Sequence, residues 1–389
     1  MRKIPCTIMR GGTSKAVFLR EADLPKDAHE REAVILSIFG SPDRRQIDGL
    51  GGADPLTSKL AIIGPPPADL PTAAGSHLSY TFGQVEIDRP EIDWLSLCGN
   101  ISSAVGLYAV QEGLVAATAP IVRVEAFNTN LGRKLSIEVP TANGEAVDAG
   151  DYTVPGVPGS GARIFVDFRD TAGGATGQLL PTGNPTDRID VPGFGEIEVS
   201  LVDIGNAHVF VRAADLGMTG IETAAEIDAN QPLLDLLETI RGLAAEKIGM
   251  IPNAARSRQD SPATPIIGMI SAPADAPNGL VGGTIPGAEV DVVSRLLFMQ
   301  QTHKTYAGTS TVCTGIAARI PGTLVHDLAR PETRDALDVR IGHPAGVIVT
   351  ESEVSLDGNT YAVHRATLGR TARRIMDGTV FVRAPAHGA

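Results

Sequence analysis

Aromatic side chains are scarce in this 389-residue sequence, which has one tryptophan, five tyrosines and ten phenylalanines. Cysteine is scarcer still. Three thiols cannot form a disulfide framework in a chain of this length, so a reducing compartment is expected. The net charge of −12 comes without any long basic block, so no nucleic-acid partner is expected. The composition predicts an acidic globular protein with few bulky side chains.

Long hydrophobic runs are also missing. The apolar stretches end at proline or charge well short of the roughly 18 residues that cross a bilayer, so no membrane span is expected. Residues 1–15 carry Arg2 and Lys3 but no apolar core or cleavage site, and they do not resemble a secretory signal peptide. We therefore expect a cytoplasmic protein.

Glycine and proline are abundant instead, with 43 and 27 residues respectively. This density of turn formers argues against a helical bundle or a coiled coil. With 43% hydrophobic residues the chain can bury a sizeable core, and at about 150 residues per domain its length predicts two to three domains. The sequence has no short internal period, which excludes solenoids and propellers.

Hydrophobic periodicity predicts alternating strands and helices in both halves of the chain. The expected strands are 4–9, 16–19, 60–63, 78–87, 121–127, 134–139, 164–168, 197–204 and 207–211, and the expected helices are 28–39, 100–112, 233–247 and 290–303. In each half a turn that carries a cysteine, Cys98 or Cys313, precedes a helix. This repetition predicts two similar α+β lobes whose cysteine turns face each other.

Cys98 stands directly before the strong helical pattern of residues 100–112. Free backbone N–H groups and the positive end of the helix dipole at such a position stabilise a thiolate or a bound anion. The alternative is a small buried side chain that happens to precede a helix. Cys313 has the same context, whereas Cys6 lies inside the first strand and is expected in the core.

Two glycine-rich loops and one lysine are further candidates in the first half. The loop Arg10-Gly-Gly-Thr-Ser14 offers N–H groups and hydroxyls to an anion, or is an ordinary hairpin turn. Gln46-Ile-Asp-Gly-Leu-Gly-Gly-Ala-Asp54 is a second such loop, and neither fits a dinucleotide or phosphate-loop motif. Lys59 leads straight into an apolar strand. It is either a buried amine with a lowered pKa, suited to proton transfer, or a lysine that reaches solvent at a strand edge.

In the second half, polar turns surround His303 and His343, and a basic cluster of Arg370, Arg373 and Arg374 follows. These side chains are suited to pairing with substrate carboxylates, or else they form surface salt bridges. The eight histidines lack metal-ligand spacing and the sequence has no C-x-x-C motif, so no metal site is expected. The G-x-S-x-G elbow of serine hydrolases is missing as well.

A series of motifs follows the chain in order. They are Met9-Arg-Gly-Gly-Thr-Ser-Lys15, Gln46-Ile-Asp-Gly-Leu-Gly-Gly-Ala53, Thr57-Ser-Lys59, Cys98-Gly-Asn-Ile-Ser102, Asp170-Thr-Ala-Gly173, Leu180-Pro-Thr-Gly-Asn184, Asp291-Val-Val-Ser-Arg295, His303-Lys-Thr-Tyr-Ala-Gly308, Ile320-Pro-Gly-Thr323, Ile341-Gly-His-Pro-Ala-Gly346 and Arg370-Thr-Ala-Arg-Arg-Ile-Met376. Together they resemble the motifs of the PrpF-type isomerases, a family that includes methylaconitate cis-trans isomerase, methylitaconate Δ-isomerase and oxalomesaconate tautomerase. Among these members, the motifs are most similar to those of methylitaconate Δ-isomerase.

The resemblance implies a diaminopimelate-epimerase-like α+β fold of two pseudo-symmetric lobes, each a sheet wrapped around a central helix. The N-terminal lobe is then expected at residues 1–182 and the C-terminal lobe at 183–374, with the active site in the cleft between them. A strand at about 375–385 is expected to return to the first lobe. The proline-rich segment 65–76 is long for the family and is expected outside the cleft.

The resemblance also implies a cofactor-independent isomerase that shifts a proton across the allylic system of a small unsaturated di- or tricarboxylate. The family's lysine corresponds to Lys59, the expected base, and its Cys-Gly-Asn cysteine corresponds to Cys98, the second expected catalytic residue. The expected substrate-binding residues are Gly11, Gly12, Thr13, Ser14, Gln46, Gly51, Gly52, Ser58, Gly99, Asn100, Ser102, His303, Thr309, Ser310, Cys313, His343 and Arg373. No metal and no organic cofactor are implied, and a homo-oligomer stays open.

Two other classes of function stay open at this point. A two-thiol racemase or epimerase would use Cys98 and Cys313 on opposite faces of a small acid. A non-catalytic protein would bind a carboxylate and support a partner dehydratase. The choice among methylitaconate, methylaconitate, aconitate and oxalomesaconate depends on a few cleft side chains that the sequence does not place.

Overall fold

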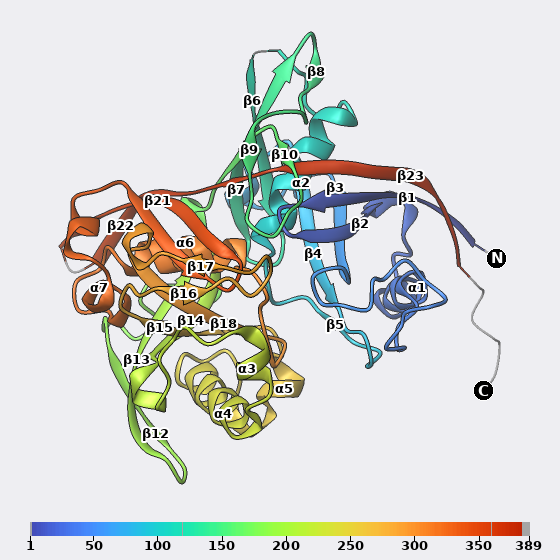
Figure 1. Cartoon of the computed structure of the whole chain (residues 1–389). Coiled ribbons are helices and arrows are strands. Elements are labelled where there is room, and N and C mark those ends of the chain that lie inside the picture. Colours follow the sequence, from blue (N-terminus) through green and yellow to red (C-terminus); the bar gives the residue numbers. More distant parts are fainter. Residues whose placement is uncertain (1, 119, 359, 383–389) are drawn as a thin grey trace, which may run out of the picture. The chain divides into compact units, whose positions relative to one another are not determined.

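The computed structural model describes residues 2–118, 120–358 and 360–382. The chain forms two compact units, which can be followed along the colour bar of Figure 1. Unit 1 comprises Met1–Thr153, Gly159–Ile164 and Arg370–Ala389, and unit 2 comprises Val154–Pro158 and Phe165–Gly369. The predicted lobes, 1–182 and 183–374, differ from these units because residues 154–158 and 165–182 belong to unit 2 and residues 370–374 belong to unit 1.

Unit 1 contains a sheet with the strand order β23-β1-β2-β3-β4-β6-β7. Its strands are β1 (Arg2–Gly11), β2 (Ser14–Arg20), β3 (Lys59–Gly64), β4 (Leu78–Val85), β5 (Ile92–Asp93), β6 (Ile121–Asn128), β7 (Arg133–Ala142), β8 (Glu145–Ala146), β9 (Tyr152–Thr153), β10 (Ser160–Gly161) and β23 (Ala372–Val382). Its helices are α1 (Ala28–Phe39) and α2 (Gly99–Gln111).

Unit 2 contains a sheet with the strand order β12-β13-β14-β15-β18-β20-β21-β22. Its strands are β11 (Ile164–Asp167), β12 (Asp187–Val191), β13 (Gly195–Ile204), β14 (Asn206–Arg212), β15 (Ile266–Ser271), β16 (Ala276–Pro277), β17 (Thr284–Ile285), β18 (Val292–Phe298), β19 (Gln301–Thr302), β20 (Asp338–His343), β21 (Gly346–Asp357) and β22 (Thr360–Arg370). Its helices are α3 (Ala224–Asp228), α4 (Gln231–Lys247), α5 (Ser257–Asp260), α6 (Gly308–Ala317) and α7 (Leu324–Leu328).

The two sheets repeat one topology. From β1 to β7 along the sheet, neighbouring strands pair antiparallel, parallel, antiparallel, parallel and antiparallel. The same alternation recurs from β13 to β21. An outer helical segment follows the second strand of each series (α1, or α3 with α4), and a long buried helix follows the fourth (α2 or α6). The predicted pair of pseudo-symmetric lobes is confirmed by this repeat.

Each sheet wraps around one central helix. Every residue of α6 is buried, and α2 is buried from Gly99 to Val110. Such a helix needs small or apolar residues around its whole circumference, because strands approach it from all sides. Gly106 and Gly315, the eighth residues of α2 and α6, mark the closest approaches. A β-carbon would lie 2.4 Å from Ile137 Cγ2 at the first position and 2.3 Å from Ser352 Oγ at the second.

The unit 1 sheet is buried on its other face as well. Along β2, Val17 and Leu19 belong to the core beneath α1, whereas Phe18 packs on Tyr108 of α2. Alternate residues of a strand point to opposite faces, so both faces of β2 meet apolar neighbours. Because both faces of the sheet are buried, its strands appear in the sequence as nearly continuous apolar runs.

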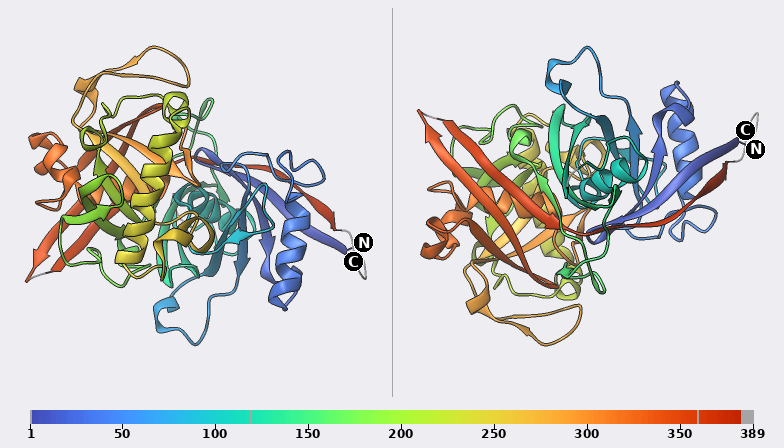
Figure 2. Two further views of the ribbon diagram at one scale, coloured as in Figure 1. Left: turned by 90° about the horizontal axis from the view of Figure 1, so that it is seen from below. Right: turned by 90° about the horizontal axis from the view of Figure 1, so that it is seen from above.

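Strand β23 brings the C-terminal part of the chain back to unit 1. It pairs antiparallel with β1 from Arg2 opposite Val382 to Gly11 opposite Ala372, and the two strands lie side by side in Figure 1 and Figure 2. The predicted returning strand at about 375–385 therefore begins earlier, at Ala372. The last three residues of that prediction lie outside the described residues.

Two local predictions for the second half are wrong. Residues 290–303, predicted as a helix, contain β18 and β19. A short apolar run fits a buried strand as well as a helix, and β18 is buried between β15 and β20. Cys313 lies inside α6, which begins at Gly308, and so it does not sit in a turn before the helix.

No helix within residues 2–118, 120–358 and 360–382 is long and apolar enough to cross a membrane.

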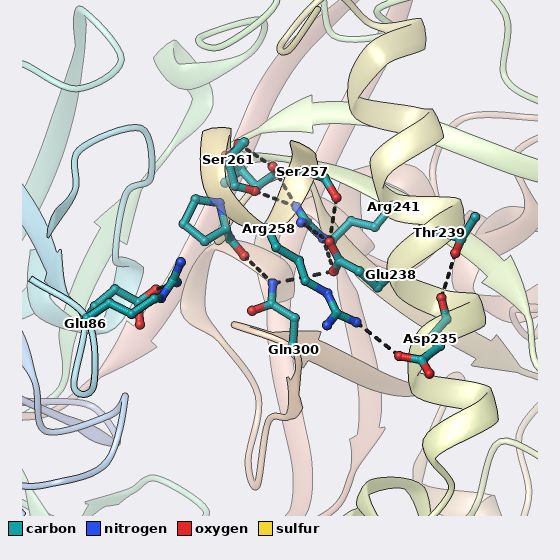
Figure 3. A network of polar contacts seen from close by, with 12 residues as sticks. Glu86, Asp235, Glu238, Thr239, Arg241, Ser257, Arg258, Ser261 and Gln300 are labelled. Carbon is teal, nitrogen blue, oxygen red and sulfur yellow. Dashed lines mark hydrogen bonds and ion pairs between the residues drawn. The ribbon is translucent and has the colours of Figure 1, made fainter. Parts of the chain in front are cut away.

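A buried ion pair ties α4 to the segment that leads into β15 (Figure 3). Arg241 donates two hydrogen bonds to the Glu238 carboxylate, at 2.6 and 2.8 Å. Arg241 Nη1 also donates to the carbonyl oxygens of Ser261 and Thr264, and the Ser257 hydroxyl donates to Glu238. Burial alone would raise the pKa of Glu238, but the hydrogen bonds and charge of Arg241 lower it overall.

This network predicts a large stability cost for Arg241→Met, because the variant leaves the Glu238 carboxylate buried without its cation. We expect the free energy of unfolding to fall by about 3 kcal/mol or more, measured by urea denaturation at neutral pH. The ion pair stabilises the fold at pH values above the pKa that Glu238 has in the unfolded chain. This stabilisation is lost as the pH falls through the lower pKa that Glu238 has in the folded protein.

Arg188→Met is the matched control for this prediction. Arg188 pairs with Glu196 at 2.8 Å, but the two side chains are 64% and 58% exposed. An exposed pair of this kind contributes at most about 1 kcal/mol. If the free energy of unfolding fell equally in the two variants, the buried network would contribute no more than an exposed ion pair.

Candidate active site

Lys59 begins β3 and lies in the interior of unit 1, with 3% of its surface exposed. It pairs with Ala16 of β2 in parallel register and with Gln84 of β4 in antiparallel register. Its Nζ donates a hydrogen bond of 2.5 Å to Gln84 Oε1 and lies 5.4 Å from the ring centre of Phe82. The apolar strand draws the lysine into the sheet, so the alternative of a lysine that reaches solvent is wrong.

The surroundings of Lys59 change its acidity. Burial lowers the pKa of the amine below that of an exposed lysine. Electrostatic interactions with Cys98, Asp54 and Asp93 oppose this shift without reversing it. Burial also raises the pKa of Asp93, so this carboxyl opposes the lowering of the Lys59 pKa less strongly. An amine that loses its proton more readily than usual is suited to act as a general base.

Cys98 is the N-cap residue of α2, and its thiol is half-buried. Both the N–H and the hydroxyl of Ser102 donate to the Cys98 carbonyl oxygen, at 2.9 and 3.0 Å. The amides of Gly99, Asn100 and Ile101 precede this first intrahelical bond, so they form the positive end of the helix. Both predicted catalytic residues belong to unit 1, and the two groups interact electrostatically.

The turn between β1 and β2 lies against the start of α2. A β-carbon at Gly11 would lie 2.3 Å from the Asn100 carbonyl oxygen, and one at Gly12 would lie 2.2 Å from Asn100 Oδ1. Gly12 also has a φ of +49°, in the left-handed region that favours glycine. Asn100 Nδ2 donates to Thr13 Oγ1 at 3.1 Å and to Ser14 Oγ at 3.5 Å. The two glycines therefore let the hydroxyls of the turn reach the helix N-terminus.

Arg370 is the buried cation beside this turn. Its Nε donates to Asn100 Oδ1 at 2.8 Å, and only 2% of its surface is exposed. Burial lowers the pKa of Arg370 to about 10, which still leaves it charged at neutral pH. Arg373, selected from the same basic cluster in the sequence analysis, is exposed on β23. The geometry favours Arg370 because strand alternation and burial, which the motif alone does not reveal, turn it toward the helix.

The side chains of Gln46 and Ser58 form hydrogen bonds that hold the second glycine-rich loop. Gln46 Nε2 donates to Ser58 Oγ at 2.8 Å, and its Oε1 accepts the Ala53 N–H at 2.8 Å. The Ser58 hydroxyl in turn donates to a backbone carbonyl of β4. Both side chains are almost fully buried, at 1% and 0% exposure. Within this loop, Gly51 and Gly52 are the more accessible of the predicted residues.

The predicted residues of unit 2 include two at the start of α6. Asn206 Nδ2 donates to Thr309 Oγ1 at 3.1 Å, and Ser310 Oγ lies 2.7 Å from Nε2 of His208. Burial lowers the pKa of His208 to about 4, so its ring is neutral at neutral pH. His208 sits in an apolar strand without a motif, and the sequence analysis did not select it.

Three other predicted residues of unit 2 are buried. His303 and His343 each accept a backbone N–H through Nδ1, from Thr305 and Ala345 respectively, at 3.2 Å. Cys313 Sγ lies 3.6 Å from a backbone carbonyl oxygen of β13. Burial raises the pKa of this thiol well above its usual range. Cys313 therefore packs in the core of unit 2 as a neutral thiol.

The repeated topology shows which positions of unit 2 correspond to the catalytic residues predicted in unit 1. Lys59 starts β3 opposite the third residue of β2, and Ile266 starts β15 opposite the third residue of β14. Cys98 is the N-cap residue of α2, and Ala307 is the N-cap residue of α6. Unit 2 thus has apolar side chains where unit 1 has an amine and a thiol.

The arrangement in unit 1 is suited to removing a proton from carbon. Lys59 supplies a base of lowered pKa, while the start of α2 and Arg370 supply donors and positive charge for a developing anion. Among the residues that the structure describes, no group of three or more histidine, cysteine, aspartate or glutamate side chains is placed to hold a metal ion.

Known proteins provide an independent comparison. The model of the PrpF protein family matches residues 1–383. The 3-methylitaconate isomerase of Eubacterium barkeri is 52% identical over 380 residues, which cover 98% of this chain and 97% of the relative. The 2-methyl-aconitate isomerase of Shewanella oneidensis is 36% identical over 398 residues, which cover 98% of this chain and 97% of the relative.

Solved structures agree with these sequence comparisons. A crystal structure of methylitaconate-delta-isomerase matches with a TM-score of 0.80 and 50% identity, over 98% of this chain and 95% of that chain. A hydroxyproline epimerase from Agrobacterium vitis matches with a TM-score of 0.57 at 12% identity, over 99% of this chain and 94% of that chain. The second match confirms the predicted epimerase-like fold. By sequence and by fold, this chain belongs to the PrpF family.

Proposed function

We propose that this chain is an isomerase that moves a proton between the two allylic ends of a small unsaturated di- or tricarboxylate of the methylitaconate type. The observation that carries the proposal is Lys59, a buried amine with a lowered pKa that interacts electrostatically with Cys98, the N-cap residue of α2. The 52% identity to a 3-methylitaconate isomerase supports the substrate class.

Substrate carboxylates bind to donors of unit 1. The first amides of α2 and the hydroxyls of Thr13 and Ser14 supply hydrogen bonds, and Arg370 supplies a full positive charge beside them. A helix N-terminus stabilises a carboxylate through its free N–H groups and its dipole. This local positive potential is needed because the whole chain carries a net charge of −12.

Neutral Lys59 removes a proton from the saturated carbon next to the C=C bond. The C–H bond breaks, an N–H bond forms, and the electron pair spreads over the conjugated carboxylate as a dienolate. Lys59 then returns the proton to the other allylic carbon, or the Cys98 thiol does so and recovers its own proton from Lys59. The double bond has moved, and no electrons have been gained or lost.

The rate depends on both the base and the stabilisation of the dienolate. A positioned general base contributes about 10²–10⁴-fold. Fixed dipoles at the start of α2, together with Arg370, act where the negative charge develops and so lower the barrier further. Because these groups are already oriented, they need little reorganisation during the reaction.

A two-thiol racemase receives no support from the site. Its second thiol would stand at the N-cap of α6, where this chain has Ala307. Cys313 is instead the sixth residue of that helix and corresponds to Ala104, inside α2. A single lysine in one lobe fits an allylic shift, since the same base removes and returns the proton.

Lys59→Met is expected to abolish the reaction while leaving the fold intact, because methionine fills a buried apolar site without supplying a base. We expect turnover and deuterium uptake to fall by about 10²–10⁴-fold. The measurement is NMR of methylitaconate, methylaconitate, aconitate and oxalomesaconate incubated with the protein in D₂O. Lys26→Met, at an exposed lysine, is the control. Binding of these acids by wild type without any exchange would instead favour a non-catalytic protein.

Cys98→Ala tests the second catalytic residue. If the thiol returns the proton, turnover falls by about 10²-fold while isotope exchange at the first carbon continues. Cys6→Ala is the matched control, because Cys6 is a buried thiol of β1 in the core beneath α1. If Cys98→Ala kept wild-type turnover, the thiol would contribute only to packing, and Lys59 would carry out both proton transfers.

A further inference from the structure

Gln84 receives the hydrogen bond of the Lys59 amine. The two residues are direct cross-strand partners in β3 and β4, and Lys59 Nζ lies 2.5 Å from Gln84 Oε1. Gln84 is 1% exposed, so its amide is held inside the sheet. The sequence analysis did not select it, because 25 residues separate it from Lys59 and no motif surrounds it.

Two backbone carbonyls lock the orientation of the Gln84 amide. Its Nε2 donates to the carbonyl oxygens of Pro55 and Ser58, each at 3.1 Å. A flipped amide would place Oε1 against those two oxygens and its N–H groups against the N–H groups of Lys59. The network therefore permits one orientation of the amide, in which Gln84 presents its acceptor oxygen to Lys59.

A fixed acceptor constrains the lone pair of the base. A neutral amine has two N–H bonds and one lone pair in a tetrahedral arrangement. When one N–H bond is directed at Gln84, the lone pair must lie in one of the remaining directions. We propose that Gln84 is a positioning residue that aims the lone pair of Lys59 without placing a negative charge beside the amine. This inference rests on the proposed role of Lys59 as the base.

Glutamine suits this role because its oxygen is uncharged. Lys59 already interacts electrostatically with Cys98, Asp54 and Asp93, and Asp93 is itself the register partner of Gln84 on β5. The neighbour on the other side of Lys59, Ala16 of β2, brings no charge. A carboxylate at position 84 would add to the negative charge and hold the proton on the amine.

Two replacements of Gln84 are expected to shift the pH profile of kcat/KM in opposite directions. In Gln84→Glu the ascending limb moves up by about one pH unit or more, so activity at neutral pH falls about tenfold or more and returns at high pH. In Gln84→Met the ascending limb moves to lower pH, because the amine loses an acceptor that favours its protonated form. There kcat falls about 10- to 100-fold at every pH, because the lone pair is no longer aimed, while KM stays nearly constant.

Gln111→Glu is the matched control for the added charge. Gln111 is exposed at the end of α2, where its Oε1 accepts a hydrogen bond from Arg374. This variant adds the same charge to unit 1, and its limb is expected to stay in place. Thermal unfolding of each variant checks that the fold is retained. If Gln84→Glu does not fold, the downward shift in Gln84→Met decides the question.

An NMR titration of the lysine ¹³Cε signals gives a readout that needs no substrate. The Lys59 signal is identified by its absence from Lys59→Met. Opposite pKa shifts of Lys59 in the two Gln84 variants support the inference even if wild type converts none of the acids, in which case only the proposed function fails. An unchanged Lys59 pKa in folded variants of an active enzyme, with the kcat of Gln84→Met close to that of wild type, overturns the inference and leaves the isomerase proposal in place.

Discussion

The enclosure of one helix by a sheet is the constraint on which each unit depends. All faces of α2 and α6 pack against other parts of the protein, so these helices consist largely of small and apolar residues. The backbone groups that remain for chemistry are those at the ends. In unit 1 the start of α2 carries Cys98 and Asn100, and the β1–β2 turn approaches it so closely that Gly11 and Gly12 have no room for a side chain. Packing therefore creates a compact set of donors at the start of α2.

The repeat of the fold makes the asymmetry of its chemistry visible. The two units share strand order, pairing directions and helix positions, yet Lys59 corresponds to Ile266 and Cys98 corresponds to Ala307. An apolar residue at the start of β15 completes the core of unit 2, whereas an amine at the start of β3 must be accommodated by Gln84. At these two positions unit 2 has apolar side chains, whereas unit 1 has a thiol and a buried amine of lowered pKa.

Sequence reasoning succeeded where local pattern and burial coincide. Helix α1 begins after Asp27, whose side chain accepts the Glu30 N–H, and ends at Gly40 in the left-handed conformation, so its limits were readable. The pattern failed at residues 290–303, because an apolar run buried on both faces has no period that separates strand from helix. It also favoured Arg373 over Arg370, since three neighbouring residues gave no indication of which one the sheet would bury.

The sequence by itself determined the family and the two-lobed fold, and it selected Lys59 and Cys98 as the proposed reactive groups, because these features are carried by contiguous motifs and by local periodicity. Only the tertiary structure decided how those groups are supported. The acceptor Gln84, the cation Arg370 and the neutral interior of Cys313 depend on strand register and on which side chains lose contact with water. Residues distant in sequence meet through these long-range pairings, and burial then changes their pKa values. No local pattern encodes either effect.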